Sequence, residues 1–207
     1  MTELKLEKSY TEKLAKKIAI RLCNEKDRIE YLKIKLGMEL ILINIGKGAI
    51  VYLIAIIFGT IIPTVITHLA CTSLRKYSKG LHAKSSIVCI LISIILFVVV
   101  PYLIQNMVID RWWVLSIGIV TTYLFYKYAP ADTEKSPIVE RDRRELLRWK
   151  SVGVNIALIC VAFVSLSPML RTLVILGGVL QVIMVLPITY KIFGRGYNNY
   201  EEYETEQ

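Results

Sequence analysis

The sequence is poor in the residues that build metal sites and disulfide frameworks. It has only two histidines and four cysteines. The cysteines are widely spaced and none stands in a CxxC pair, so neither a disulfide framework nor a redox motif is indicated. A set of two histidines and two cysteines can be drawn from the first half of the chain, but its spacings fit no common zinc finger. That set is His68, Cys71, His82 and Cys89. We therefore expect no metal and no cofactor.

Two further features are missing. Residues 1–36 are highly charged and lack an apolar h-region with a cleavage site, so we expect no secretory signal peptide. No nucleic-acid motif accompanies the formal net charge of +9. The positive charge is concentrated between apolar runs, where attraction to an anionic inner leaflet explains it. We therefore expect a lipid bilayer as a partner and no nucleic acid.

Long apolar runs are abundant. Hydrophobic residues make up 55% of the chain and the mean hydropathy is +0.51, more apolar surface than a soluble domain of this length buries. Most runs approach the roughly 20 residues that cross a bilayer. They cover residues 38–58, 60–74, 87–103, 108–126, 152–166 and 173–193. This pattern predicts an all-α polytopic membrane helical bundle with about six membrane segments.

The positive charges between the runs predict the topology. The run 60–74 is short and contains Pro63, so it is expected to be tilted, broken or re-entrant. If residues 38–74 crossed the membrane once, the basic loops 71–86 and 127–150 would both lie outside, against the positive-inside rule. Two crossings, or entry and return, place both loops and both termini on the cytoplasmic side of the cell membrane.

Residues 1–36 alternate charged and apolar positions. Leu14, Ile18 and Leu22 recur at helical spacing among ten Lys or Arg residues. This predicts one or two amphipathic helices on the cytoplasmic face, with an ordinary solvated helical hairpin as the alternative. The chain is thus interpreted as a single membrane-embedded domain, residues 1–207, with an amphipathic region at 1–36, a membrane bundle at 38–193 and a cytoplasmic tail at 194–207.

The basic island at residues 74–89 carries the candidate chemistry. His82 precedes Cys89 by seven residues, about 10.5 Å along a continuous helix, which is too far for a hydrogen bond between the two side chains. The pair can meet only if the backbone bends between them. Gly80 permits such a bend, and Ser85 or Ser86 is a good N-cap for a helix that begins near Ile87.

Such a bend would place Cys89 in the first turn of a helix. Free backbone N–H groups there, with nearby Arg75, Lys76 and Lys84, would stabilise a thiolate and receive an oxyanion. Cys89 as nucleophile and His82 as general base and acid would form a cysteine-peptidase dyad. The alternatives are a cysteine that only packs and an interfacial histidine without a chemical role. Asp132 is a distant candidate for a group that orients the histidine.

The residues of the island also carry a resemblance. The pattern Arg75-x4-Gly80-x-His82-Ala83-x5-Cys89 resembles the signature of the accessory gene regulator B family of membrane-embedded cysteine endopeptidases. Residues 128–138 resemble a cytoplasmic loop of that family, and the order of charged and apolar parts agrees. The sequence departs from the pattern at Lys79 and Leu81, where many members have a second glycine and an aromatic residue.

The resemblance implies a function in quorum sensing. Members process the propeptide precursor of a cyclic autoinducing peptide: they remove its charged C-terminal tail, hold the peptide as a thioester and release it as a thiolactone or lactone. By similarity, Cys89 would be the nucleophile and His82 the base, while Arg75 and Gly80 map onto motif positions needed for activity. A homodimer is expected by analogy.

Four arginines between the fourth and fifth apolar runs are candidates for substrate binding. The released tail in this family is typically acidic, and guanidinium groups bind carboxylates well. The residues are Arg141, Arg143, Arg144 and Arg148. The alternative is an ordinary positive-inside anchor. Without the resemblance, a small transporter subunit with functional Glu39 and Lys47, or a non-catalytic scaffold, would be the leading interpretation.

Overall fold

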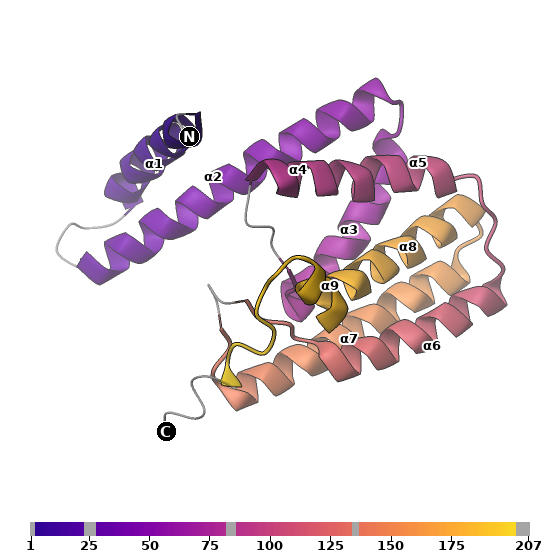
Figure 1. Ribbon diagram of the computed structural model, residues 1–207. Coiled ribbons are helices and arrows are strands. Elements are labelled where there is room, and N and C mark those ends of the chain that lie inside the picture. The colour runs from indigo at the N-terminus through magenta and orange to yellow at the C-terminus, as the bar shows by residue number, and fades with distance from the viewer. Residues whose placement is uncertain (1–2, 23–27, 82–85, 134–136, 202–207) are drawn as a thin grey trace. The chain divides into compact units, whose positions relative to one another are not determined.

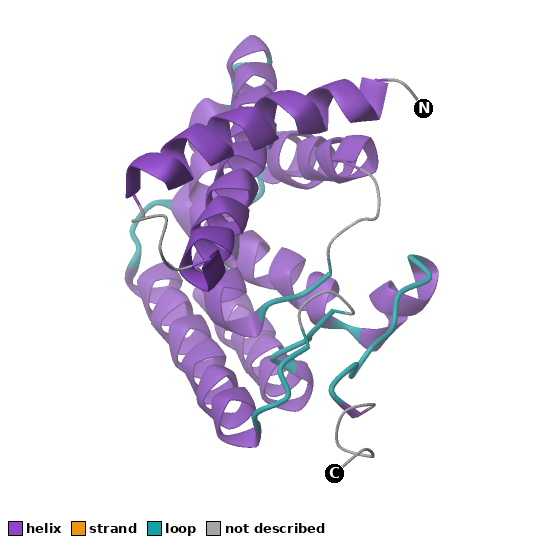
Figure 2. Cartoon of the chain, turned by 90° about the vertical axis from the view of Figure 1, so that its left-hand side faces the viewer, coloured by secondary structure: helices purple, strands orange, loops and turns teal. Residues whose placement is uncertain are grey.

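The computed structural model describes residues 3–22, 28–81, 86–133 and 137–201 (Figure 1). These residues form helices joined by turns and loops, and no strand occurs among them (Figure 2). The all-α prediction is therefore confirmed. The chain divides into two compact units, residues 1–53 and 54–207, and each is described by itself.

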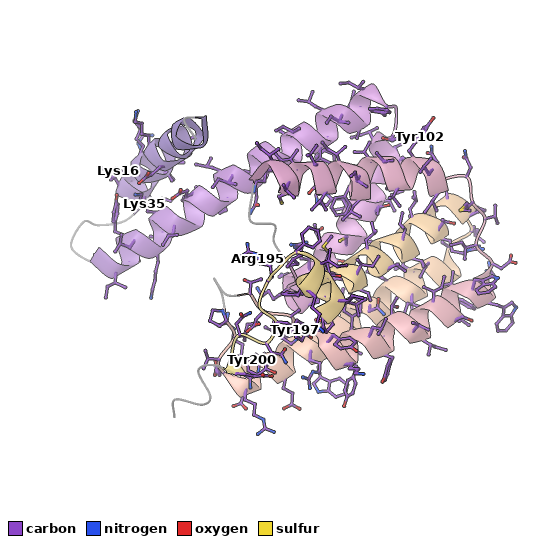
Figure 3. All side chains as sticks on the ribbon, in the orientation of Figure 1. Lys16, Lys35, Tyr102, Arg195, Tyr197 and Tyr200 are labelled. Carbon is purple, nitrogen blue, oxygen red and sulfur yellow. The ribbon has the colours of Figure 1, made fainter. Side chains whose placement is uncertain are left out.

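The first unit contains α1 (Glu3–Leu22) and most of α2 (Arg28–Ile57). Lys35 of α2 donates to Glu12 of α1 at 2.8 Å, and the buried residues Ala15 and Ala19 lie on α1 (Figure 3). The helix α2 is continuous through Gly46 and Gly48. The charged region and the first apolar run therefore share one helix, without a break between residues 36 and 38.

The second unit contains the remaining helices. They are α3 (Ile61–Ser78), α4 (Ser86–Ile94), the π-helical turn η1 (Ile95–Val99), α5 (Val100–Ile104), α6 (Arg111–Tyr128), α7 (Arg141–Val164), α8 (Pro168–Val185) and α9 (Pro187–Ile192). Each apolar run thus becomes helical. The last one is divided between α8 and α9 at Pro187, whose ring fits the first turn of a helix.

Among the described residues, four helical segments are long and apolar enough to cross a membrane. They are Ile29–Ile57, Ile87–Ile104, Arg141–Val164 and Pro168–Val185. Apolar side chains on their outer surfaces, such as Leu91 and Leu103, are exposed, as lipid-facing residues are. A polytopic membrane bundle is therefore confirmed. The number of six segments stays a prediction, because α3 and α6 are not among the four.

Helix α8 lies at the centre of the second unit. It packs against α3, α6 and α7, and most of its length is buried (Figure 1). Gly177 lets α3 approach, since a Cβ atom there would come within 2.6 Å of the Ala70 side chain. The fully buried Leu173 and Gln181 also belong to α8. Helix α8 therefore forms the centre of the core, and its C-terminal half also contacts the segment that follows α3.

One predicted loop is wrong in its second half. The sequence predicts a loop over residues 127–150, but α7 begins at Arg141. Arginine and glutamate have high helix propensity, so a charged stretch extends an apolar helix beyond its membrane-length part. The four candidate arginines consequently lie on the first turns of α7.

Candidate functional site

The helix break expected between Arg75 and Cys89 is present. Helix α3 ends at Ser78, and α4 begins at Ser86. Lys79 closes α3 with φ 58° and ψ −132°, and its N–H group donates to the Arg75 carbonyl oxygen at 3.0 Å. Gly80 follows with φ 120°. His82 and Ser85 lie outside the described residues.

Gly80 and Leu81 lie against the C-terminal half of α8. The Leu81 N–H group donates to the Met184 carbonyl oxygen at 3.0 Å. A Cβ atom at residue 80 would come within 3.0 Å of that same oxygen. Glycine is therefore required here twice, by its positive φ and by the close approach of the α8 backbone.

The loop after α6 lies on the other side of this turn. The Gly80 N–H group donates to the Ala131 carbonyl oxygen at 3.0 Å, and the Ala131 N–H group donates to the Ser78 carbonyl oxygen at 3.0 Å. These two bonds join two segments that are about 50 residues apart, as the numbering shows. The turn after α3 is therefore fixed between α8 and the loop that follows α6.

Gln181 fixes the turn from within the bundle. Its Nε2 atom donates to Ser78 Oγ at 2.8 Å and to the Lys79 carbonyl oxygen at 2.6 Å, and its Oε1 atom accepts from Cys71 Sγ at 3.4 Å. The side chain is fully buried, so each bond replaces one that water would make. The sequence analysis missed this residue. The available signal was a single amide in the apolar run of α8.

Two residues of the family pattern meet at this turn. Arg75 Nη2 donates to the Leu81 carbonyl oxygen at 2.8 Å, so the guanidinium closes the segment that contains Gly80. The predicted supporting residues Arg75 and Gly80 are thus brought together. Leu81, the last described residue before the break, is thus bonded through both its N–H and its carbonyl group.

Cys89 lies near the N-terminus of α4, as the sequence predicts. Its side chain is half-buried and lines a narrow, mainly apolar pocket with a cavity volume of about 50 Å³. The pocket is lined by residues of α3, α4, η1 and α8, among them Arg75, Phe97 and Met184, and by Leu81 of the turn after α3. The candidate nucleophile therefore faces the same pocket as the fixed turn that precedes His82.

The other cysteines of the described chain differ from Cys89. Cys71 also lines the pocket but is buried and donates to Gln181, and Cys160 is exposed on α7. The His68 ring stacks on Phe97 with a centroid separation of 4.7 Å. Within the described ranges, no three residues among His, Cys, Asp and Glu gather as metal ligands would.

Asp132 binds the segment after α9. Its Oδ1 atom accepts from the Asn199 backbone N–H group at 3.0 Å and from Asn199 Nδ2 at 3.2 Å, and its Oδ2 atom accepts from the Tyr200 N–H group at 3.1 Å. The carboxylate is buried. Asp132 was a candidate for orienting the histidine, but in the structure its oxygens hold residues 199 and 200 in place.

Three of the four predicted arginines form a second, polar pocket. Arg141, Arg144 and Arg148 line it together with Glu145 and Tyr200, and its cavity volume is about 300 Å³. Arg143 is exposed and is not among the lining residues, so its predicted role in binding stays a prediction. A cavity with three guanidinium groups and one carboxylate is suited to an anionic partner.

Two of these arginines also support the fold. Arg144 Nη1 donates to the carbonyl oxygens of Ile138 and Val139 at 3.0 and 2.8 Å, and its guanidinium lies 3.9 Å from the centre of the Tyr200 ring. Arg148 Nε donates to the Ala129 carbonyl oxygen at 3.2 Å. Arg141 is exposed at the start of α7, and no such bond joins it to the backbone of the described residues.

Fold and site together define a polytopic helical membrane protein with a cysteine at the wall of an apolar pocket. Comparison with known families agrees with this class. The family described as "Accessory gene regulator B" matches residues 10–185, and the chain belongs to that family. Membership assigns the protein to the quorum-sensing system of that name.

Named relatives share most of their length with this chain. An AgrB-like protein of Clostridium acetobutylicum is 37% identical over 97% of each chain. An AgrB-like protein of Listeria monocytogenes serovar 1/2a is 41% identical over 86% of this chain and 87% of its own. The accessory gene regulator protein B of Staphylococcus epidermidis is 37% identical over 81% of this chain and 85% of its own. No solved structure matches the chain.

Proposed function

We propose that this protein is a membrane-embedded cysteine endopeptidase that cuts and cyclises the propeptide precursor of an autoinducing peptide. One observation carries the proposal: Cys89 lies near the N-terminus of α4 on the wall of the pocket that the fixed turn at Leu81 also lines. His82 follows that turn by one residue. The proposal pairs this soft nucleophile with His82, the base seven residues earlier in the chain.

The proposed reaction has two acyl transfers. His82 takes the proton of the Cys89 thiol, and the sulfur attacks the carbonyl carbon at the cleavage point. The C–N bond breaks, the leaving amine receives the proton from His82, and the charged tail departs. A thiol or hydroxyl of the bound peptide then attacks the thioester, which closes a thiolactone or lactone ring and restores the Cys89 thiol.

The apolar pocket favours ring closure over hydrolysis. Most of the residues that line it are aliphatic or aromatic, such as Ile92, Leu96 and Phe97, and its cavity volume is only about 50 Å³. A site that limits water protects the thioester, so the nucleophile within the bound peptide meets less competition. Exchange of one thioester for another is nearly balanced in energy, whereas hydrolysis would discard the activation.

The arginine pocket on α7 is proposed to hold the acidic tail of the precursor. Arg141, Arg144 and Arg148 would pair with carboxylates there, in agreement with the positive charge that the cavity presents. Arg143, which is exposed and does not line the pocket, would add to the positive charge near it. The positive-inside pattern supports cytoplasmic placement of the first turns of α7, of both termini and of the site. A homodimer is part of the proposal by analogy with the family.

Cysteine substitution tests the proposal directly. Cys89→Ala and His82→Ala should each abolish cleavage of a co-expressed precursor peptide, measured by immunoblotting of its tagged tail. Cys160→Ala is the matched control, because it also removes one thiol from a membrane helix but at an exposed position on α7 that does not line the pocket, and it should preserve cleavage. Continued processing by Cys89→Ala would exclude the peptidase mechanism.

Reversing the charge of two pocket arginines should weaken processing while membrane insertion stays intact, and unchanged cleavage would exclude their role.

A further inference from the structure

The arginine pocket lies beside an acidic segment of this same chain. Tyr200 forms part of the pocket wall, and the residues that follow it read Glu-Glu-Tyr-Glu-Thr-Glu-Gln. Four of these seven residues are carboxylates and none is basic. We propose that residues 201–207 are a ligand of the pocket formed by Arg141, Arg144 and Arg148, and that they exclude other acidic peptides from it.

The structure fixes where this segment starts. Asp132 accepts hydrogen bonds from Asn199 and from the N–H group of Tyr200, which is labelled in Figure 3. The Arg144 guanidinium lies over the Tyr200 ring at 3.9 Å. Glu201 continues this fixed segment, since its N–H group donates to the Asn198 carbonyl oxygen at 3.0 Å. The acidic residues therefore begin next to the pocket wall, at Glu201, whose carboxylate also accepts a hydrogen bond from Asn198 Nδ2 at 2.8 Å.

Length and charge both suit this occupant. Six residues after Glu201 can extend about 20 Å, which is enough to cross a cavity of about 300 Å³. Three guanidinium groups against one carboxylate, Glu145, leave the pocket with an excess of positive charge. The N-terminus of α7 adds a partial positive charge from the helix dipole, because Arg141 is the first residue of that helix.

Tethering makes even weak binding effective. A short flexible tether gives a bound segment an effective concentration in the millimolar range. A segment that binds with a dissociation constant near 1 mM would then occupy the pocket about half of the time. A free acidic peptide must compete with it. This inference adds self-occupancy to the proposed function, which assigns the same pocket to the acidic tail of the precursor.

Peptide binding tests the inference without reference to catalysis. The probe is a fluorescent synthetic peptide with the sequence of residues 201–207, and its binding to the purified protein in detergent is followed by anisotropy. A chain that ends at Glu201 should bind the probe about twofold more tightly than the full chain, because a segment that occupies the pocket half of the time doubles the apparent dissociation constant. The full chain with Glu202, Glu204 and Glu206 all changed to Gln should show the same gain, and it keeps the test valid if the shortened chain fails to fold.

Two substitutions in the shortened chain locate the binding. Arg141→Gln should weaken probe binding about tenfold, because it removes a charge-assisted contact. Lys150→Gln removes the same charge from an exposed position on α7 that does not line the pocket, and it should leave the affinity unchanged. Equal affinity of the full and shortened chains, or equal losses in the two variants, would overturn the inference. A protein that shows self-occupancy but fails to cut a precursor would instead refute only the proposed function.

Discussion

The Gln181 amide donates to the Lys79 carbonyl oxygen at 2.6 Å, across 102 residues of sequence. This bond joins the most buried membrane helix to the turn that precedes the candidate histidine. Gln181 also holds Ser78 Oγ and Cys71 Sγ, so a single amide satisfies three polar groups of α3 and its C-terminal turn. Disturbing it should therefore change both the stability of the bundle and the geometry of the site.

Gln181→Leu should lower the free energy of unfolding by about 2 kcal/mol, because it leaves buried polar partners without bonds. Under the proposed function it should also slow precursor cleavage. Gln181→Glu keeps the acceptor for Cys71 but loses both donated bonds, so its free energy of unfolding and its cleavage rate should fall to a similar extent. Thermal unfolding in detergent and a cleavage assay measure the two effects. Gln105→Leu, in the segment after α5, serves as the matched control and should change neither value.

Gly80→Ala should be more damaging than an ordinary glycine substitution. The new methyl group would come within 3.0 Å of the Met184 carbonyl oxygen at a φ of 120°, so the turn must shift away from α8. We expect a loss of about 2 kcal/mol in the free energy of unfolding and a loss of cleavage. Gly153→Ala is the control, since nothing lies within 4 Å of its added Cβ atom in α7. Equal effects of the two substitutions would refute the close approach.

Much of the fold could be predicted from the sequence because membrane helices are encoded locally. A run of apolar residues must form a helix in lipid to satisfy its own backbone, and the break at Gly80 follows from spacing and glycine. The start of α7 was predicted wrongly because a charged stretch between apolar runs is typical of a loop. At Arg141 that stretch instead continues the helix beyond its membrane-length part.

The partners of the site could not be predicted in the same way. The bond from Gln181 to Ser78 joins residues 103 positions apart, and the bond from Asn199 to Asp132 spans 67. Spacing contains no information at that range. The sequence does show which polar residues interrupt apolar runs, and each of them must find a partner when buried. It identifies Gln181 as a residue in need of partners without showing which ones.

Lys79→Gly should stabilise the protein. Lys79 closes α3 with a φ of 58° and a ψ of −132°, a conformation that glycine adopts freely and lysine does not. We expect a gain of about 1 kcal/mol in the free energy of unfolding, seen as a higher melting temperature in detergent. Lys76→Gly, within the last turns of the same helix, should lose about 1 kcal/mol. A loss from both substitutions would show that Lys79 is unstrained.

Alkaline pH should loosen the segment after α9 before the bundle unfolds. Burial raises the pKa of Tyr197 to about 12, and its hydroxyl donates to the Tyr128 carbonyl oxygen at 3.3 Å. A pKa raised in the folded state means that the folded form holds the proton more tightly, so stability falls between about pH 10 and about pH 12. In Tyr197→Phe, the tyrosinate absorbance should lack one group that titrates near pH 12, and stability should fall less steeply between pH 10 and pH 12. If the group lost in Tyr197→Phe is instead one that titrates near pH 10, Tyr197 ionises like an exposed tyrosine and the prediction is refuted.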